Sequence, residues 1–234
     1  MAQKKLLRFA EIKTFANVLE YPQDMQGKWR SLLKNENDIV LELACGRGEY
    51  TVGLARLHPE TNYIGVDVKG NRLWIGAAEA LRSGLQNACF LRTQIELIAT
   101  YFSKEEVKEI WITFPDPQLR VSKQKRRLTH PRFLRLYQQV LAADGCIHLK
   151  TDSPDLYQFT KRVTEEYSLT LLEANDDVYA TENVAPEMYI KTHYEKLDIA
   201  QSKRIFYLRF RLDADLSADK EDELKRWEYE KING

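Results

Sequence analysis

Short apolar runs alternate with longer stretches of helical periodicity from residue 38 onward. The apolar runs predict buried strands at 38–44, 63–67, 88–92, 109–114, 145–150, 168–173 and 204–211. Apolar residues spaced three or four apart predict helices at 24–33, 49–58, 72–83, 95–102, 131–141 and 154–167. Strands that alternate with helices form a mostly parallel sheet with both faces covered.

This pattern predicts an α/β fold with a doubly wound, mostly parallel, seven-stranded Rossmann-like sheet. A long irregular stretch separates the last two strands, so we expect the last strand to run antiparallel. We expect residues 1–37 to form an N-terminal arm and helix, residues 38–212 the sheet domain, and residues 213–234 a charged, solvent-facing C-terminal helix.

Composition excludes several classes of protein. The 234 residues are 44 % hydrophobic and 30 % charged, which is too apolar for a disordered chain. We find neither an apolar run long enough to span a bilayer nor a signal-peptide core, and we expect a cytoplasmic protein. Cys45, Cys89 and Cys146 are far apart and predict reduced thiols. The histidines show no ligand spacing, so we expect no metal site.

The charges are balanced in number but uneven in position. Lys and Arg total 35, as do Asp and Glu, yet residues 117–143 contain no acidic residue. The basic side chains of this segment are Arg120, Lys123, Lys125, Arg126, Arg127, Arg132 and Arg135. A local basic segment on a neutral protein favours a polyanion site, and the alternative is a solvated helix face.

The first predicted strand ends in a glycine turn. Gly46 and Gly48 would let the backbone approach a ligand closely, and Asp67, at the end of the next strand, can accept hydrogen bonds from ribose hydroxyls. A dinucleotide dehydrogenase would have a small residue where Thr51 stands. Glu42 would repel a pyrophosphate but suits a cationic nucleoside, S-adenosylmethionine.

A second candidate feature is Phe114-Pro115-Asp116-Pro117, directly after the fourth predicted strand. The prolines restrict the backbone and hold the Asp116 carboxylate in a defined direction. Taken alone, this stretch is also typical of an ordinary turn. The basic segment that follows it would place a polyanion beside the same pocket.

From about Ile39 to Arg211, the sequence resembles the bacterial tRNA (guanine-N7)-methyltransferases, a family of class I S-adenosylmethionine-dependent enzymes. The motifs that carry the resemblance are Phe114–Pro117 followed by Lys125-Arg126-Arg127-Leu128, then Thr151-Asp152, and then Thr192-His193-Tyr194-Glu195. The resemblance implies S-adenosylmethionine as cofactor and tRNA as partner. It also implies methyl transfer to guanine N7 in the tRNA variable loop, at position 46 of standard tRNA numbering.

The resemblance also implies roles for individual residues. Asp116 would be the catalytic residue, and the cofactor would contact Glu42, Gly46, Gly48, Asp67, Gln94 and Asp116. The target nucleotide would contact Arg120, Asp152, Thr192, His193, Tyr194 and Glu195. RNA phosphates would contact Lys123, Lys125, Arg126 and Arg127. The sequence departs from the family at Ala44, Gln94, Gln118 and Arg120, where glycine, Asp, Trp and Lys are usual.

Two alternatives remain open at this point. One is a class I methyltransferase that acts on another RNA or on a small-molecule amine. The other is an RNA-binding adaptor on a decayed methyltransferase fold, which would have lost Glu42, Asp67 or Asp116, whereas all three are present. The sequence is compatible with a monomer or a homodimer.

Overall fold

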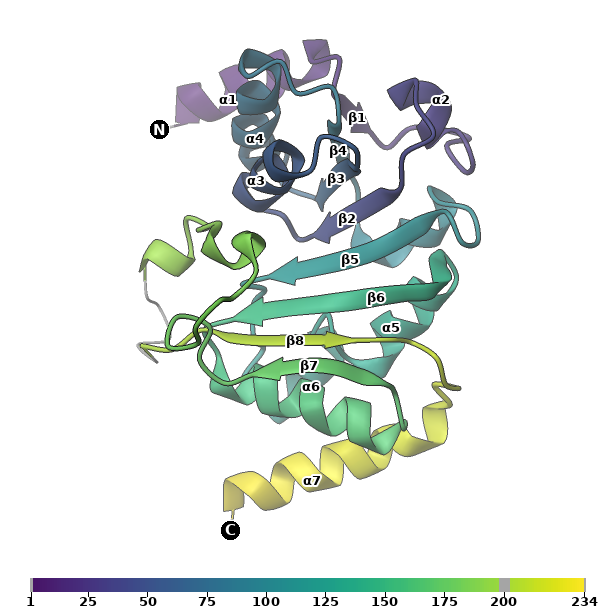
Figure 1. Ribbon diagram of the computed structural model, residues 1–234, viewed down its shortest axis with the longest axis vertical. Helices are drawn as coiled ribbons and strands as arrows, with labels where there is room; N and C mark the ends of the chain where they lie inside the picture. The colour runs from purple at the N-terminus through teal and green to yellow at the C-terminus, as the bar shows by residue number, and fades with distance from the viewer. Residues whose placement is uncertain (1, 198–202, 234) are drawn as a thin grey trace.

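The computed structural model describes residues 2–197 and 203–233, and its centre is an eight-stranded sheet (Figure 1). The strands are β1 (Val18–Glu20), β2 (Ile39–Leu43), β3 (Asn62–Asp67), β4 (Ala88–Arg92), β5 (Val107–Thr113), β6 (Leu141–Thr151), β7 (Leu171–Asn175) and β8 (Phe206–Phe210). Their spatial order is β1-β4-β3-β2-β5-β6-β8-β7. Met1 and Gly234, the ends of the predicted N-terminal arm and C-terminal helix, lie outside the described residues.

The direction of the strands confirms the predicted mostly parallel sheet. All pairings from β1 through β6 are parallel, and β8 runs antiparallel to both β6 and β7, as expected for the last strand. The order reverses at β2, because β3 lies on one side of it and β5 on the other. The arrows of β2, β5 and β6 point the same way in Figure 1, so the loops that follow these strands meet at one edge. In such sheets, ligands bind at this switch point.

Helices cover both faces of the sheet. The α-helices are α1 (Ala2–Glu11), α2 (Trp29–Leu33), α3 (Glu49–Leu57), α4 (Gly70–Arg82), α5 (Pro131–Gln138), α6 (Pro154–Glu166) and α7 (Glu221–Asn233). Helices α3 and α4 contribute to one apolar core, and α2, α5, α6 and α7 contribute to the other. The starts of α5 and α6 follow from sequence, since His130 and Ser153 cap them and a proline follows each cap.

Several elements differ from their predicted form. The short 3₁₀ helices are η1 (Ile12–Thr14), η2 (Ile95–Thr100), η3 (Val121–Arg126), η4 (Pro186–Tyr189), η5 (Glu195–Leu197) and η6 (Ala218–Lys220). The helix predicted at 95–102 is therefore the 3₁₀ turn η2. The helix predicted at 24–33 shortens to α2, because Asp24 and Gly27 both have positive φ. Strand β1 was not predicted, since three residues are too few to show a period.

The C-terminal helix α7 begins at Glu221 rather than at residue 213, and it faces solvent on one side while its other side packs against the body of the protein. Leu224 is fully buried and Glu228 is 6 % exposed, while Trp227 packs against the core. These residues lie three or four positions apart and therefore share one helix face.

No helix of the described residues is long and apolar enough to cross a membrane.

Candidate active site

Asp67 ties together the loops that follow β2 and β3. Its Oδ2 atom accepts a hydrogen bond from the Gly46 amide at 3.0 Å, and its Oδ1 atom accepts one from the Lys69 amide at 2.8 Å. A carboxylate offers about four lone-pair sites, so Asp67 can still accept from a ligand.

Ala44, where the family usually has glycine, keeps the left-handed backbone that glycine favours, with φ 56°.

The two glycines of the first loop differ in the space around them. Gly48 has φ 70°, and a Cβ there would lie 2.5 Å from Phe90 Cε1. Gly46 has φ 58°, but a Cβ there would meet its nearest neighbour, Tyr194 Cε2, at 3.5 Å. Gly48 is therefore required by both backbone and packing, whereas Gly46 is required by backbone alone.

We expect Gly48→Ala to lower the free energy of unfolding by about 2–3 kcal/mol, since it adds a steric clash to the left-handed strain. Gly46→Ala is the matched control and should cost about 1 kcal/mol from strain alone. Urea unfolding of both variants measures the difference. Equal losses would show that Phe90 moves aside without cost.

Glu42 lies beneath the first loop rather than in the open pocket. It is 2 % exposed, and its Oε2 atom accepts hydrogen bonds from the Thr51 amide at 2.8 Å and from Thr51 Oγ1. Its Oε1 atom accepts from Thr113 Oγ1 at 2.7 Å. Burial raises the pKa of the Glu42 carboxyl to about 7, because the charged form is disfavoured away from water. Glu42 thus joins β2 to the first turn of α3 and to the end of β5.

A pocket of about 510 Å³ lies beside the carboxyl ends of β2, β3 and β4. Its lining residues are Ala44, Asp67, Val68, Thr93, Gln94, Ile95, Glu96, Arg126, Leu128, Arg132 and Phe133. The volume is typical of small-molecule sites. Of the residues predicted to contact the cofactor, Asp67 and Gln94 line this pocket. Glu42, Gly46, Gly48 and Asp116 do not.

The second wall of the pocket was not predicted. Arg126, Leu128, Arg132 and Phe133 come from the basic segment and the start of α5, and they face the loops after β3 and β4. The sequence feature that points to these residues is the basic segment itself. We expected that segment beside the pocket but not as part of its wall. The pocket and the basic segment therefore share side chains.

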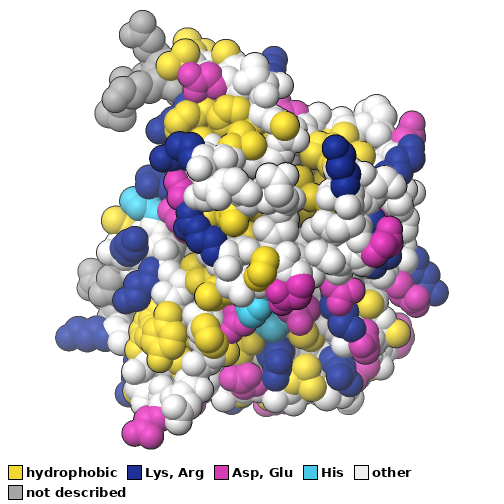
Figure 2. All heavy atoms as spheres, turned by 45° about the horizontal axis from the view of Figure 1, so that its top comes forward, with side chains coloured by type: hydrophobic (Ala, Val, Ile, Leu, Met, Phe, Trp, Pro, Cys, Tyr) yellow, Lys and Arg dark blue, Asp and Glu magenta, His cyan; other side chains and the backbone are white. Residues whose placement is uncertain are grey.

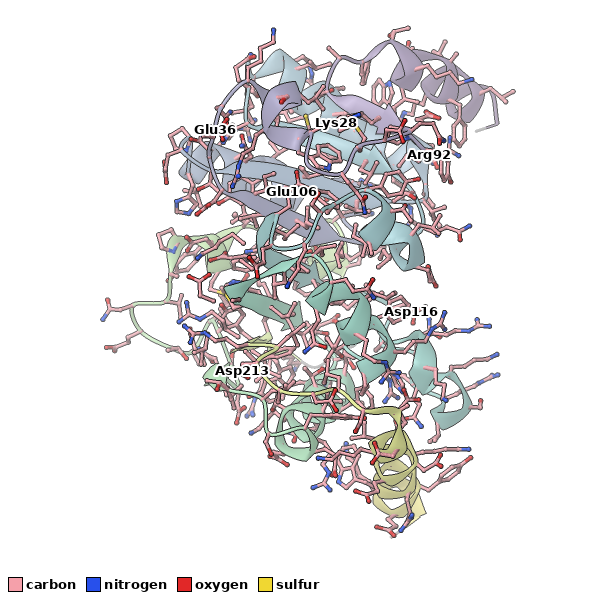
Figure 3. The ribbon with its side chains drawn as sticks, turned by 90° about the vertical axis from the view of Figure 1, so that its right-hand side faces the viewer. Lys28, Glu36, Arg92, Glu106, Asp116 and Asp213 are labelled. Atoms are coloured by element: carbon pink, nitrogen blue, oxygen red, sulfur yellow. The ribbon has the colours of Figure 1, made fainter. Side chains whose placement is uncertain are left out.

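Asp116 lies in the loop after β5, between two residues with left-handed backbone. Phe114 has φ 47° and Gln118 has φ 48°. The Asp116 side chain is exposed and points outward in Figure 3, and its Oδ1 atom accepts a hydrogen bond from the Gln118 amide at 3.0 Å. Strained backbone of this kind persists only where surrounding contacts hold it, and it is common at functional sites.

Lys150, at the end of β6, binds the segment that carries the Thr192–Glu195 motif. Its ammonium group is buried, and it donates to the carbonyls of Met188 and Ile190 at 2.9 and 3.1 Å and to Glu195 Oε2 at 3.3 Å. Burial lowers the pKa of Lys150, although Glu195 opposes that shift. Glu195 also accepts a hydrogen bond from the Tyr179 hydroxyl. The carboxylate predicted to contact the target nucleotide is therefore already paired within the protein.

The Thr192–Glu195 motif reaches the glycine loop after β2. Tyr194 lies over Gly46, and the Arg72 guanidinium lies 5.4 Å from the centre of the Tyr194 ring. The His193 ring packs edge-on against Tyr194, and the Thr192 hydroxyl accepts a hydrogen bond from the Glu195 amide at 3.1 Å. Segments that are far apart in sequence thus meet at one edge of the sheet.

The basic segment is mostly accessible, with one exception. Arg120, Lys125 and Arg126 are exposed and Lys123 is half-buried, although Lys125 is within 3.0 Å of Glu221. Dark-blue basic side chains also gather along the left edge of Figure 2, on the side toward which the strand arrows of Figure 1 point. Asp152, predicted to contact the nucleotide, follows β6 directly and is half-buried.

Arg127 does not fit its predicted role as a phosphate contact. Its side chain is 1 % exposed, and its guanidinium is within 2.5 Å of Glu228 on α7. Charge alone suggested a solvent-facing residue, because the acidic partner lies a hundred residues further along the chain. We therefore replace this expectation by a structural role for Arg127.

One group of three side chains among the described residues has the donor types of a metal site. It consists of Glu109, Cys146 and His148, whose donor atoms all lie within 4.8 Å of one another. His148 Nε2 is 3.2 Å from Cys146 Sγ, and its Nδ1 is 2.7 Å from the Tyr207 hydroxyl. Burial raises the pKa of the Cys146 thiol to about 12. The three side chains are linked through His148, whose Nε2 also lies 3.3 Å from Glu109.

Comparisons with known proteins agree with this geometry. The family described as "Putative methyltransferase" matches residues 36–208. The chain is 44 % identical over 221 residues to the tRNA (guanine-N(7)-)-methyltransferase of Bacteroides fragilis (strain YCH46), with 91 % of this chain and 87 % of the relative covered. Identity to the enzyme of that name from Porphyromonas gingivalis (strain ATCC BAA-308 / W83) is 47 %, covering 86 % of each.

Solved structures show the same fold. The crystal structure of the 16S rRNA methyltransferase KamB superposes with a TM-score of 0.60 at 15 % identity and covers 83 % of this chain and 97 % of its own. At that identity, the likeness concerns the fold alone. The motifs, the family match and the identity to curated relatives lead to one conclusion: the chain belongs to the tRNA (guanine-N(7)-)-methyltransferase family.

Proposed function

We propose that this protein transfers the methyl group of S-adenosylmethionine to N7 of a guanine in tRNA, at position 46 in the variable loop. The observation that carries the proposal is the convergence of the Asp67–Gln94 pocket, the Asp116 loop and the basic segment at one edge of the sheet. The names of the relatives support tRNA as the substrate.

The pocket residues suit an adenosine group. Asp67 would accept hydrogen bonds from the ribose hydroxyls, and the Gln94 amide oxygen would accept one from the adenine amino group. Gly46 and Gly48 shape the loop beside them, and Glu42 supports that loop from below. The cofactor, when bound, supplies a methyl group that its sulfonium already activates.

The chemistry requires little of the protein besides alignment. Guanine N7 has a free lone pair and no proton, so no general base is needed. The site would contribute by orienting N7 toward the methyl carbon, a gain of several kcal/mol. The methylated purine ring is cationic, and the exposed Asp116 carboxylate would stabilise that charge as it develops. Asp152 would accept hydrogen bonds from guanine N1–H and the exocyclic amine. Thr192, His193, Tyr194 and the internally paired Glu195 would shape that side of the site.

The tRNA would bind across the basic segment. Arg120 would contact the target nucleotide, and Lys123, Lys125 and Arg126 would contact phosphates. An unstacked loop nucleotide presents N7 more readily than a base in a helix, whose major groove is deep and narrow in RNA. A tRNA substrate and three free buried thiols fit a cytoplasmic location.

We expect Lys123→Ala to weaken tRNA binding at low salt and to reduce the slope of log affinity against log salt concentration by about 0.7–0.9. Each phosphate contact that is lost removes one site of counterion release. Lys104→Ala is the matched control, because Lys104 is exposed in the loop before β5, at the opposite edge of the sheet. Filter binding over a range of salt concentrations gives both slopes. Equal slopes for Lys123→Ala and wild type would contradict the assignment.

The reaction itself is tested with two tRNA transcripts. One carries guanosine throughout, and the other carries 7-deazaguanosine, which has no nitrogen at position 7. Labelled S-adenosylmethionine should transfer its methyl group to the first transcript and not to the second. Equal labelling of both transcripts would overturn the proposal that N7 is the acceptor.

A further inference from the structure

Arg127 connects three elements that are distant in sequence. Its Nε atom donates to the Pro117 carbonyl at 3.1 Å, and its Nη2 atom donates to the Gln118 carbonyl at 3.0 Å. The same Nη2 atom pairs with Glu228 Oε1 on α7, and the guanidinium carbon lies 4.4 Å from the centre of the Phe159 ring on α6. Arg127 therefore holds the two residues that directly follow Asp116.

These contacts continue to the Asp116 carboxylate. The Gln118 carbonyl accepts a hydrogen bond from Arg127, and the Gln118 amide donates one to Asp116 Oδ1. Gln118 also has the left-handed backbone, φ 48°, that needs support from its surroundings. The direction of the Asp116 side chain therefore depends on a peptide that the Arg127 guanidinium fixes.

Glu228 keeps the guanidinium in place. The Arg127 side chain is 1 % exposed and that of Glu228 is 9 % exposed, so water cannot replace either partner. A buried charge that loses its partner is strongly disfavoured, and an unpaired Arg127 would turn toward solvent and away from the loop. Glu221, two turns earlier on α7, holds the same helix to the basic segment through Lys125 and Arg135.

We propose that Glu228 on the C-terminal helix is a positioning residue for methyl transfer. It acts through Arg127 on the Pro117–Gln118 loop and thereby on Asp116. This inference rests on the proposed function of Asp116. The match to the family model ends at residue 208, before α7 begins at Glu221.

The test compares Glu228→Gln with Glu230→Gln, which makes the same change at an exposed position on the same helix. Single-turnover methyl transfer to tRNA is measured with both substrates saturating, together with cofactor affinity. We expect Glu228→Gln to lower the rate at least about tenfold with cofactor affinity nearly unchanged, since small misplacements of reacting groups have effects of this size. Glu230→Gln should match wild type. Equal rates for the two variants would overturn the inference.

A double variant separates positioning from stability. Arg127→Met with Glu228→Leu replaces the buried pair by apolar side chains, which generally preserves stability. This variant should melt near the wild-type temperature yet transfer methyl groups slowly, because the loop carbonyls still lack their donor. A stable double variant with the wild-type rate would overturn the inference. Absence of 7-methylguanosine with the wild-type protein would instead refute the proposed function.

Discussion

Asp116→Asn should lower the single-turnover rate of methyl transfer by roughly 10²–10³-fold with both substrates saturating. The substitution keeps the size of the side chain and removes the negative charge that, in the proposed function, would stabilise the developing purine cation. Losses of this size are typical when one group that stabilises transition-state charge is removed. Rapid-quench measurement of labelled tRNA gives the rate, and equilibrium titration shows whether both substrates still bind.

The control for this variant is Asp222→Asn, an identical change at an exposed position of α7. Its rate should equal that of wild type. Among the residues that the structure describes, Asp116 accepts one hydrogen bond, from the Gln118 amide, so its replacement should leave the melting temperature nearly unchanged. Full turnover of Asp116→Asn would remove the charge-stabilising role and leave alignment as the contribution of the loop.

Lys150→Met should lower the free energy of unfolding by about 3–5 kcal/mol. The change leaves the Glu195 carboxylate, whose side chain is 5 % exposed, without its positive partner, and it removes the donor to the carbonyls of Met188 and Ile190. Breaking a buried ion pair at one end has costs of this size, because the remaining charge stays desolvated. Urea unfolding measures the loss.

Two further variants make this prediction specific. Lys191→Met is the control. The ammonium groups of Lys150 and Lys191 lie 5.7 and 4.9 Å from the centre of the Tyr179 ring, but Lys191 is exposed. The control should cost less than about 1 kcal/mol. The double variant Lys150→Met with Glu195→Met should recover much of the stability, because no buried charge remains. A double variant as unstable as Lys150→Met alone would show that the carbonyl contacts, and not the ion pair, account for the loss.

Much of the fold could be predicted from local sequence. The apolar runs located β2 to β5 closely, because buried parallel strands are continuous apolar segments. The antiparallel strand β8 was also located, since four of its five residues are buried. Strand β6 begins at Leu141, where a helix was predicted to end, and its predicted start at residue 145 was late because Ala143 and Asp144 are exposed. Strand β7 begins at Leu171 rather than at Ser168, whose φ of 52° cannot extend a strand. The shortness of β1 left no pattern to detect.

The candidate site was predictable where it depends on strand ends. Asp67 is the last residue of β3, and Gln94 closely follows the neighbouring strand β4. They share one pocket, since the ends of parallel strands meet at one edge. Asp116 follows β5 on the other side of the switch point. For these residues, the order of the strands determines the position of the side chains.

Pairings between distant segments could not be predicted. Lys150 looked like an ordinary strand residue, and its partner Glu195 lies 45 residues further along the chain, beyond α6 and β7. Arg127 belongs to a run of basic residues, so its charge suggested RNA, whereas the structure places it against Glu228. Sequence reveals the charge of a side chain, but its burial and its partner depend on how the whole chain packs.

The central claim is that this site methylates guanine N7, and product identification tests it most directly. Unmodified tRNA would be incubated with S-adenosylmethionine and the protein, digested to nucleosides and analysed by mass spectrometry against standards. We predict 7-methylguanosine with the wild-type protein and almost none with Asp116→Ala. A different methylated nucleoside, such as 1-methyladenosine or 1-methylguanosine, would contradict the claim.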